Sequence, residues 1–567
     1  MRHLTVLLLA VTLLCGCGSP SPAAILVQGA NGTYAVKTTL AAAAVAPDAA
    51  GKTVVVTSAL SAVQSNISSA TLHAWPADRT LRVAPGGSIG NTTTFRYTGD
   101  TSQWPLQQVF AGTGAVTLGA TSDGYPDYFQ TNTTPGTTDM TAGVTKAIAA
   151  LPSGSVLRFR PTTYKVSSTG TDIFTITKNI SLAGTRNATT IVGYVTDTAN
   201  NIFNFSVTSN NGNGDVRGQS VTGIGAYFAG STLGASSVYV EGVGTGVLPQ
   251  FEFTVSDCSL QGVWAHAVVF HSTAAFSNIV GNTLENGVGF LHKCADGQRV
   301  LYNNIFGSMQ TGIVFDIEFG SYSHLVQGNV ITTKKGQIRI LNGSQIKIVY
   351  NQFEQYPGYG VNDSPYAAQI TVGEAGGTNG ADYQSVGVTI EDNNIGGGSN
   401  VAHGIMVLNC SLASIDKNIF PGVTTSTFVN FATGAYSSNN YLGDKNLFGG
   451  VPADGEVFSS ASSLNYGVAY SATGITFVNG WSATATMTYV LKEDGTVSFR
   501  GAFVSGTATT GTVIATLPVG LRPTAARYLT VGTGGVPGSI RVDTNGEVVV
   551  LTLAAAAAYL DGITMRL

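Results

Sequence analysis

Charged residues are scarce in this sequence. Only 10% of the 567 residues are Asp, Glu, Lys or Arg, and the formal net charge is −4 with no basic block. Nucleic-acid binding needs clustered Lys and Arg, so we expect no nucleic-acid partner. The hydrophobic content of 43% excludes a disordered chain. The 71 glycines, with abundant Thr, Ser and Asn, favour an all-β protein over one built from long helices.

Cysteine is also scarce. There are five cysteines, and two of them lie within the first 17 residues. The remaining three, Cys258, Cys294 and Cys410, lie far apart, and no Cys/His pairing has the spacing of a zinc site. We predict buried free thiols rather than a disulfide, and we expect neither a metal nor a cofactor.

Long apolar runs are absent after the N-terminus. The run over residues 4–14 follows a basic start and is too short to span a bilayer, which predicts a signal peptide over residues 1–22. Residues 14–17 (Leu-Cys-Gly-Cys) resemble a bacterial lipoprotein cleavage box, which implies lipidation of Cys17 and a membrane tether. Ordinary secretion with cleavage near Ala23 is the alternative. Either way, the protein is predicted to be secreted or at the cell surface.

A short signature recurs between Thr254 and Phe448: Asn, any residue, then a bulky apolar residue. The signatures start at Cys258 (in place of Asn), Asn282, Asn304, Asn329, Asn351, Asn393, Asn418 and Asn440. Successive starts lie 22 to 25 residues apart, except for one step of 42, which is either two turns or one turn with an inserted loop. A fixed period of this size predicts a solenoid.

Each period contains segments in which apolar and polar residues alternate, which is typical of strands. We predict two or three short strands per period, joined by tight corners. Stacked periods would form a parallel β-helix with coils about 4.8 Å apart. The apolar residue of each signature would stack inside. The asparagines would form a ladder at one corner, with their amides bonded to the backbone of neighbouring coils.

Regions on both sides flank this solenoid. Residues 23–124 contain short β-like segments and form either an adaptor or the first coils. Met140, Val144, Ile148 and Leu151 lie at helical spacing, which predicts a short amphipathic helix capped by Thr138 or Asp139. Such a helix would cover the open end of a solenoid over residues 125–450. The repeat then stops, and residues 451–567 have the hairpin patterns of a β-sandwich.

Several of these segments resemble a known family. The segments are Leu-Pro-Ser-Gly at 151–154, Arg-Phe-Arg-Pro-x-x-Tyr at 158–164 and Leu-Ala-Gly at 182–184, after the helix that follows Asp139. They resemble the opening of the pectate-lyase superfamily, which includes bacteriophage tailspikes, although Thr162 stands where that pattern has Gly. The resemblance implies a right-handed parallel β-helix over residues 125–450.

The C-terminal region resembles the β-sandwich of phage tail fibres. The resemblance rests on Glu-Asp-Gly-Thr-Val at 493–497, Leu-Pro-x-Gly-x-Arg-Pro at 517–523 and Leu-Asp-Gly-Ile at 560–563. It implies a homotrimer, with the sandwich serving in trimer assembly or glycan contact. A plain sandwich that only covers the far end of the solenoid is the alternative.

Acidic residues are few in the repeat, and one pair stands out. In the segment 313–319 the apolar residues alternate with Asp316 and Glu318, which should both point outward. Their Cα atoms would be about 6.5–7 Å apart, a separation that suits the two carboxyl groups of an inverting glycoside hydrolase. The alternative is that two exposed acids merely solvate the outer face.

Other candidates surround this pair. Glu285 and Glu354 lie on coils three apart, about 14 Å by coil spacing, which is too far to pair with each other, but either could partner Asp316. Trp264 and His266 should face outward two coils earlier. Trp264 could be a platform for a sugar ring or a subunit contact. His266 could take part in substrate binding or be an ordinary surface histidine. Arg339, one coil later, could bind an acidic sugar or be an ordinary surface Arg.

The break in the period, Gln355–Gln384, is predicted to be a loop that carries function. Its substrate-binding candidates are Tyr356, Tyr359, Asp363 and Tyr366, because tyrosine rings pack against sugar rings and their hydroxyls bond to sugar hydroxyls. The alternative is a loop that packs on its own coil or on a neighbouring subunit.

These observations predict a tailspike-like depolymerase, a glycoside hydrolase that binds and cleaves a bacterial surface polysaccharide with Asp316 and Glu318 as acid and base. A non-catalytic glycan-binding adhesin and a structural surface lipoprotein are alternatives. A polysaccharide lyase is less favoured, because we find no Asp cluster for calcium. The signal peptide speaks against a virion tail protein, since phage tails assemble in the cytoplasm, but a virion tail stays an alternative.

Overall fold

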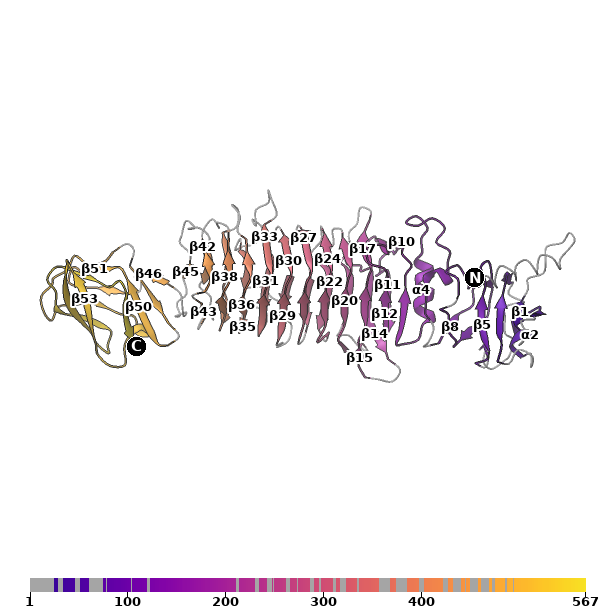
Figure 1. The fold of residues 1–567 in the computed structure, drawn as a ribbon, viewed down its shortest axis with the longest axis horizontal. Helices are drawn as coiled ribbons and strands as arrows, with labels where there is room; N and C mark the ends of the chain where they lie inside the picture. Colours follow the sequence, from indigo (N-terminus) through magenta and orange to yellow (C-terminus); the bar gives the residue numbers. More distant parts are fainter. Residues whose placement is uncertain are drawn as a thin grey trace. The chain divides into compact units, whose positions relative to one another are not determined.

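A computed structural model of the chain (Figure 1) describes residues 25–567 with short gaps. The gaps are 29–33, 46–50, 61–74, 78, 103, 120–122, 211–213, 230–233, 242–246, 248, 262–265, 273, 286–289, 295–296, 309–312, 317–322, 334–335, 356–367, 374–384, 397–401, 422–426, 432–439, 444, 449–456, 460–468, 472–474, 485–486 and 493. The chain divides into two compact units, residues 1–264 and 265–567, which are described separately.

The first unit begins with short strands that pair mostly in parallel. They are β1 (Ile25–Gln28), β2 (Tyr34–Lys37), β3 (Thr53–Val56), β4 (Ala59–Leu60), β5 (Thr80–Val83), β6 (Ser88–Ile89), β7 (Phe95–Tyr97) and β8 (Val116–Leu118), with the short helix α2 (Leu40–Val45). The pairs β3–β5, β4–β6 and β7–β8 are parallel, whereas β1 pairs antiparallel with β2 and β3.

The helix α4 (Thr141–Ala150) follows the 3₁₀ turn η2 (Pro126–Tyr128). The predicted apolar stripe is confirmed, since its four residues are at most 9% exposed. An Asp139 carboxylate oxygen accepts from the Thr141 backbone N–H at 2.9 Å. At the other end Lys178 Nζ donates to the carbonyl oxygens of Ala149 and Leu151 at 2.7 and 2.9 Å. A cation at the C-terminal carbonyls stabilises a helix.

A buried acid explains the Arg-Phe-Arg-Pro-x-x-Tyr segment. Asp127 in η2 is 1% exposed and forms an ion pair with Arg160. Tyr164 donates its hydroxyl to the other oxygen of Asp127 at 2.6 Å and accepts from the Arg160 backbone N–H at 3.0 Å. Burial raises the pKa of Tyr164 above its ordinary value. Arg160 and Tyr164 thus tie η2 to the first β-helix coil.

Three parallel sheets build the coils of the first unit. Their strands are β9 (Ser155–Arg158), β12 (Ile180–Ala183), β16 (Ser220–Thr222) and β20 (Thr254–Ser256); β10 (Thr163–Ser167), β13 (Thr190–Tyr194), β17 (Gly225–Phe228) and β21 (Ser259–Gln261); and β11 (Phe174–Lys178), β14 (Phe203–Ser209) and β18 (Ser236–Val240). Outside these sheets, β15 (Val216–Arg217) pairs with β19 (Gln250–Phe251).

The second unit continues with the same coil pattern, seen in Figure 1 as rows of parallel arrows. Sheet 1 contains β23 (Asn278–Val280), β26 (Arg299–Leu301), β29 (His324–Gln327), β32 (Ile346–Val349), β36 (Thr389–Glu391), β40 (Ser414–Asp416) and β43 (Tyr441–Leu442). Sheet 2 contains β24 (Thr283–Glu285), β27 (Asn304–Ser308), β30 (Val330–Thr333), β33 (Gln352–Gln355), β37 (Asn394–Ile395), β41 (Ile419–Phe420) and β44 (Leu447–Phe448).

Sheet 3 contains β22 (His266–Ser272), β25 (Phe290–Cys294), β28 (Ile313–Asp316), β31 (Ile338–Asn342), β34 (Ala368–Val372), β38 (His403–Val407), β42 (Thr427–Phe431) and β45 (Val457–Ser459). The strands β35 (Ser385–Val386) and β39 (Cys410–Ser411) form a separate parallel pair. Each coil of the second unit thus contributes one strand to each sheet. The prediction of a parallel β-helix with about three strands per period is confirmed.

The predicted asparagine ladder is present, with two corrections in its register. The ladder residues are Asn282, Asn303, Asn329, Asn351, Asn393, Asn418 and Asn446. Each amide oxygen after the first accepts from the backbone N–H and the side-chain amide of the preceding ladder residue, for example at 3.0 and 2.9 Å between Asn282 and Asn303. Together these bonds satisfy polar groups in the buried corner.

The predictions that Asn304 and Asn440 belong to the ladder are wrong. Asn303-Asn304-Ile305 also fits the signature, and the inner member, Asn303, occupies the ladder while Asn304 is exposed. Asn440 precedes β43 in sheet 1 and bonds to the backbone of residues 410 and 413 instead. The pattern alone could not separate these positions, because each has an apolar residue two places later.

The long step of 42 residues is one turn with inserted segments. Asn351 bonds directly to Asn393, and β33 pairs directly with β37. The predicted single loop over Gln355–Gln384 is wrong in part, because β34 lies within it as a buried strand of sheet 3. Two segments, 356–367 and 374–384, flank this strand and lie outside the described residues.

The residue immediately before a ladder asparagine forms a corner with left-handed backbone conformation. The residue preceding the ladder asparagine has a φ of 54–55° at Tyr302, Tyr350, Asp392 and Lys417. At Gly328, φ is 67°, and an added Cβ would lie 2.5 Å from the Tyr302 ring. The Tyr302 ring therefore leaves no room for a side chain at Gly328, whereas other residues adopt the same conformation on other coils.

Two of the predicted free thiols are confirmed. Cys258 and Cys410 are buried and unbridged, and burial raises the pKa of each thiol to about 12. The side chain of Cys294 lies outside the described residues. Buried protonated thiols of this kind act as small apolar core groups.

The end of the second unit is an antiparallel β-sandwich, as predicted. One sheet has the order β46 (Ala469–Ser471), β49 (Thr488–Leu491), β50 (Thr496–Arg500) and β57 (Ile563–Arg566). The other has the order β47 (Thr476–Phe477), β52 (Val513–Thr516), β55 (Glu547–Thr552), β54 (Val536–Val542), β53 (Arg527–Thr533), β56 (Ala557–Tyr559), β51 (Ala502–Val504) and β48 (Ser482–Ala483), with the 3₁₀ turn η4 (Val519–Leu521).

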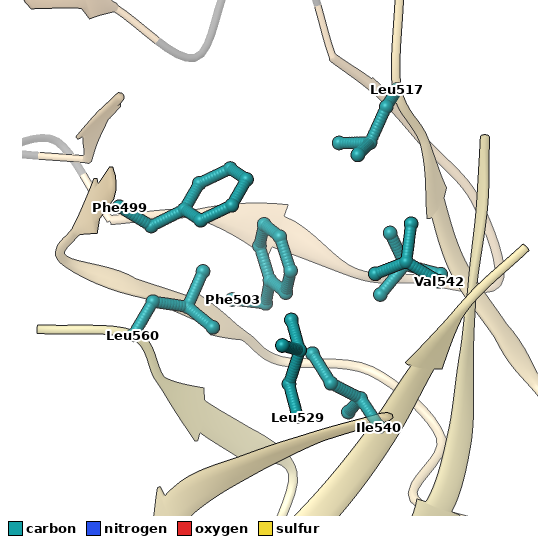
Figure 2. Close-up of a pocket in the computed structure, with 8 residues that line it drawn as sticks. Phe499, Phe503, Leu517, Leu529, Ile540, Val542 and Leu560 are labelled. Carbon is teal, nitrogen blue, oxygen red and sulfur yellow. The ribbon is translucent and has the colours of Figure 1, made fainter. Parts of the chain in front are cut away.

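Figure 2 shows the apolar interior of this sandwich. Phe499 and Phe503 lie near Leu529, Ile540 and Val542 around a small cavity lined only by apolar side chains. No helix in the described part of the chain is both long and apolar enough to cross a membrane.

Candidate active site on sheet 3

The candidate site is built around Asp316 at the end of β28. Ile313 and Phe315 are fully buried, which confirms that they form the inner face of this strand. Alternation along the strand then places Val314 and Asp316 on the outer side. Asp316 is nevertheless only 8% exposed. The Asp316 carboxylate is therefore not the exposed acid of the alternative interpretation, and Glu318 lies outside the described residues.

A bulge in the next coil supplies a partner for this carboxylate. Phe315 pairs with Ile340, but Asp316 pairs with Asn342, so that Leu341 is an extra residue on β31. The extra residue brings Asn342 into register with Asp316. Asn342, 2% exposed, donates from its amide to an Asp316 carboxylate oxygen at 3.3 Å. The bulge thus places a neutral donor beside a buried acid.

Two further polar residues lie in the adjoining row of sheet 3. Arg339 pairs with Val314 of the preceding coil and with Thr371 of the following coil. The Arg339 side chain is half-buried. Thr371 is 1% exposed, and its hydroxyl has no hydrogen-bond partner within the described structure. This row therefore places a cation and an available hydroxyl two residues from Asp316 along the strand direction.

The preceding coils bring basic residues to the row of Asp316. His271 pairs with Lys293, and His292 pairs with Phe315. Extending this register by one residue places the backbone of Lys293 next to Asp316. His271 is half-buried, and the side chain of Lys293 lies outside the described residues. His271 and the backbone of Lys293 thus lie in the two coils before the acid.

This arrangement suits acid–base chemistry on a substrate that lies on the outer side of sheet 3. A carboxylate can transfer a proton, and a neutral amide donor fixes its orientation. A half-buried guanidinium can bind a sugar hydroxyl or carboxylate. Among the described residues no group of three or more His, Cys, Asp or Glu side chains could hold a metal ion.

The structure does not bring Glu285 and Glu354 to this site. The register of sheet 2 aligns Glu285, Phe306, Thr332 and Glu354 in one row, which confirms that the two acids are three coils apart. Both belong to sheet 2, whereas Asp316 belongs to sheet 3. Glu354 is exposed and accepts from the Gln352 side chain.

The remaining predicted residues divide into two groups. His266 begins β22 and is half-buried, and the next two residues, Ala267 and Val268, are both fully buried, so the predicted alternation is not present there. The others lie outside the described residues: Cys17, Trp264, Glu318, Tyr356, Tyr359, Asp363 and Tyr366.

Sequence reasoning missed Asn342 and Thr371. Asn342 lies beside Asp316 because of a bulge, and no local sequence pattern predicts that bulge. Thr371 lies in β34, a strand that was taken for part of a loop. Its signal was the apolar alternation of Ile370 and Val372, which is the pattern of a buried strand.

Solved structures with a similar fold are tailspikes and a glucanase. The Dettilon tailspike protein is 13% identical, with a TM-score of 0.38 and with 77% of this chain and 93% of that chain covered. A mutant tailspike of Escherichia coli bacteriophage HK620, in complex with a pentasaccharide, is 12% identical, with a TM-score of 0.42 and with 76% and 89% covered. The catalytic unit of the GH87 alpha-1,3-glucanase from Streptomyces thermodiastaticus is 14% identical, with a TM-score of 0.35 and with 59% and 67% covered.

These proteins are parallel β-helices, as the strand pairing of this chain shows it to be. The predicted parallel β-helix is confirmed by the strand pairing of this chain itself. No family model matches the sequence, and no curated protein matches it by sequence.

Proposed function

We propose that this protein is a glycoside hydrolase that binds and cleaves a bacterial surface polysaccharide on the outer side of sheet 3. One observation carries the proposal: Asp316 is an outward-facing carboxylate that is 8% exposed and receives an amide hydrogen bond through a bulge. Burying a charge is costly, and nothing in the coil repeat requires one at this position. The position of Asp316 is therefore a candidate for a functional site.

In the proposed mechanism Asp316 is one of the two carboxyl groups of an inverting hydrolase and Glu318 is the other. One protonates the oxygen of the leaving sugar, and the other activates the attacking water. Asn342 keeps the Asp316 carboxylate oriented toward the substrate. Arg339, which is half-buried in the adjoining row, would hold the sugar next to the scissile bond.

The test is a reducing-end assay on the mature chain with a panel of bacterial capsular and O-antigen polysaccharides. New reducing ends without ultraviolet absorbance of an unsaturated uronate would support a hydrolase. Absorbance that rises with the ends would contradict hydrolysis and indicate a lyase, with Arg339 and His266 as the next residues to change. Binding without cleavage across the panel would contradict the enzyme and indicate an adhesin.

Assembly and location are part of the same proposal. We propose a homotrimer that is secreted or held at the cell surface through a lipidated Cys17, with the virion tail as the alternative location. Light scattering of the purified chain should give three times the chain mass. Replacing Cys17 by Ser should release the protein from the membrane fraction, and an unchanged distribution would contradict lipidation.

A further inference from the structure

The outer face of sheet 1 carries a repeated pair of side chains in its middle coils. Arg299 in β26 is exposed and is followed three residues later by Tyr302, and Lys347 in β32 is exposed and is followed three residues later by Tyr350. Tyr302 is 60% exposed and Tyr350 is 62% exposed. Two cations and two aromatic rings are thus in contact with water on one face of the β-helix.

The strand register places the two pairs in line along the β-helix. Arg299 pairs with Leu325, and Leu325 pairs with Lys347. Tyr302 and Tyr350 each immediately precede a ladder asparagine, so they occupy the same corner. One coil lies between the two pairs, which puts equivalent Cα atoms two coil spacings, or roughly 10 Å, apart. We call the surface formed by Arg299, Tyr302, Lys347 and Tyr350 the cation–tyrosine face.

The intervening coil holds the ring of Tyr302 in place. An added Cβ on Gly328 would lie 2.5 Å from this ring, so the ring lies against the bare backbone of the next coil. Gln327 donates its side-chain amide to the Tyr302 hydroxyl at 3.4 Å. A ring that is held on one side and open to water on the other loses little conformational freedom when a ligand stacks on it.

The two cations differ from other exposed cations in their pairing. Among the residues that the structure describes, neither Arg299 nor Lys347 forms an ion pair. The exposed Arg186 of the first unit, in contrast, forms an ion pair with Asp257 at 3.0 Å. The guanidinium and the ammonium of the cation–tyrosine face therefore meet an external anion without competition from a described acid.

Acidic residues bound this surface at its C-terminal side. Val349 pairs with Glu391 on the next coil, and Glu391 pairs with Asp416 on the coil after that. Like charges repel, so a polyanion that lies on the cation–tyrosine face would end before these two acids. The charge pattern thus limits the site to the coils of β26, β29 and β32.

We propose that the cation–tyrosine face binds a linear anionic polysaccharide that bears one carboxylate on every second sugar. A sugar ring stacks on each tyrosine, and each cation binds a carboxylate through charge-assisted hydrogen bonds. The spacing of roughly 10 Å between the pairs is comparable with the length of a disaccharide in an extended chain. Successive disaccharides therefore present the same groups to both pairs. This site is separate from the one on sheet 3, and its ligand class does not follow from the proposed hydrolysis.

A second copy of the chain is the competing occupant of such a surface. The cores of interfaces between copies are depleted in lysine, and burying a cation without a partner is costly. The unpaired Arg299 and Lys347 therefore favour a hydrated anionic ligand over the surface of another copy.

Biolayer interferometry of the mature chain on hyaluronan, which bears one carboxylate on every second sugar, tests the proposal. Hyaluronan whose carboxyl groups have been reduced to alcohols is the neutral control ligand. We expect binding to hyaluronan that weakens as salt is added, and binding to the reduced polymer that is about tenfold weaker or more. A lack of binding to hyaluronan would overturn the proposal. Because binding is measured and not cleavage, failure of the proposed hydrolase would leave this result unchanged.

Two double variants separate the contributions of charge and stacking. Arg299→Gln/Lys347→Gln should bind hyaluronan about tenfold or more weakly, and its binding should depend less on salt. Tyr302→Ala/Tyr350→Ala should also bind about tenfold more weakly, because both stacking platforms are lost. The double variant with Phe at both tyrosine positions should retain most of the binding, because the rings remain.

The double variant Arg186→Gln/Arg217→Gln is the matched control. It removes the same net charge from exposed ion pairs of the first unit and should bind as the wild type does. Equal weakening in this control would show that binding follows net charge alone and would overturn the proposal. Full binding by the folded Arg299→Gln/Lys347→Gln variant would do the same. If that variant changes the oligomeric state measured by light scattering, the face is an interface between copies and the proposal is also overturned.

Discussion

The asparagines of the ladder and Asn342 are all buried in the second unit, but they differ in how they recur along the coils. The ladder asparagines recur on every coil and bond to one another and to the backbone. Asn342 occurs once, at a bulge, and bonds to a carboxylate. A buried polar group that recurs in every coil completes the hydrogen bonding between coils. One that occurs in a single coil needs another explanation, and the neighbour of Asn342 is a buried acid.

The largest expected effect comes from Asp316→Asn. If Asp316 is catalytic, the rate of polysaccharide cleavage should fall on the order of 10³-fold, about 4 kcal/mol in activation free energy. The thermal unfolding midpoint should be unchanged or higher, because a buried charge is removed. Asp257→Asn, at an exposed corner, is the control and should cleave normally. A stable protein with full activity would place Asp316 among the scaffold residues.

Asn303→Ala should have the largest effect on stability among the asparagine changes. The substitution removes the amide that bonds to Asn282, Asn329 and the Ile279 carbonyl oxygen and leaves buried groups without partners. We expect a loss of about 3 kcal/mol in the free energy of unfolding, measured by denaturant titration.

Asn304→Ala is the matched control for this change. Asn304 is the next residue, fits the same sequence signature and is exposed. We expect the control to unfold within about 0.5 kcal/mol of the wild type. Equal losses in the two variants would mean that the ladder hydrogen bonds contribute nothing measurable.

Asn342→Leu should affect polysaccharide cleavage more than stability, whereas Asn303→Ala should affect mainly stability. Its amide makes one bond to a charged group, and such bonds are worth about 1.5–3 kcal/mol, so cleavage should slow about ten- to a hundredfold. Stability should fall by no more than in Asn303→Ala, because one side-chain hydrogen bond is lost instead of several. The measurement is turnover at saturating polysaccharide beside the unfolding midpoint. Wild-type turnover in a destabilised protein would make Asn342 a scaffold residue like those of the ladder.

The smallest expected effect concerns pH and the helix α4. Burial acts to raise the pKa of Asp139, but hydrogen bonds from Ser167 and Thr141 outweigh it and hold the pKa below its usual range. The ionised form therefore stabilises the fold above the ordinary Asp pKa of about 3.9, and this contribution is lost as the pH falls through the lower folded-state pKa.

Thermal unfolding between about pH 5 and 3 checks this expectation. Asp139→Asn should have a slightly lower midpoint near pH 5, and its midpoint should fall less steeply with acid than that of the wild type. Parallel curves for the two proteins would show that the Asp139 hydrogen bonds do not favour the ionised form.

The sequence predicted the repeating parts of this molecule well and the single exceptions poorly. The coil period, the inward Ile313 and Phe315 and the stripe of α4 follow from spacing, because every coil or turn imposes the same requirement. Asn303 and Asn304 could not be separated, since both satisfy the pattern and only packing chooses one. The bulge at Leu341 depends on how two coils pair, so no local rule could place Asn342 beside Asp316.

The ladder also makes each coil a removable unit. Asn351 donates its backbone N–H and its side-chain amide to the Asn393 amide oxygen, and Asn393 donates to the Asn418 amide oxygen in the same way. Excising residues 393–417 would therefore bring Asn418 under Asn351 with the register intact and shorten the β-helix by one coil spacing, about 4.8 Å. A gene that encodes such a fold can grow or shrink by whole periods through duplication and deletion. The length of the protein is then a heritable quantity that changes in fixed steps, independently of the chemistry on its surface.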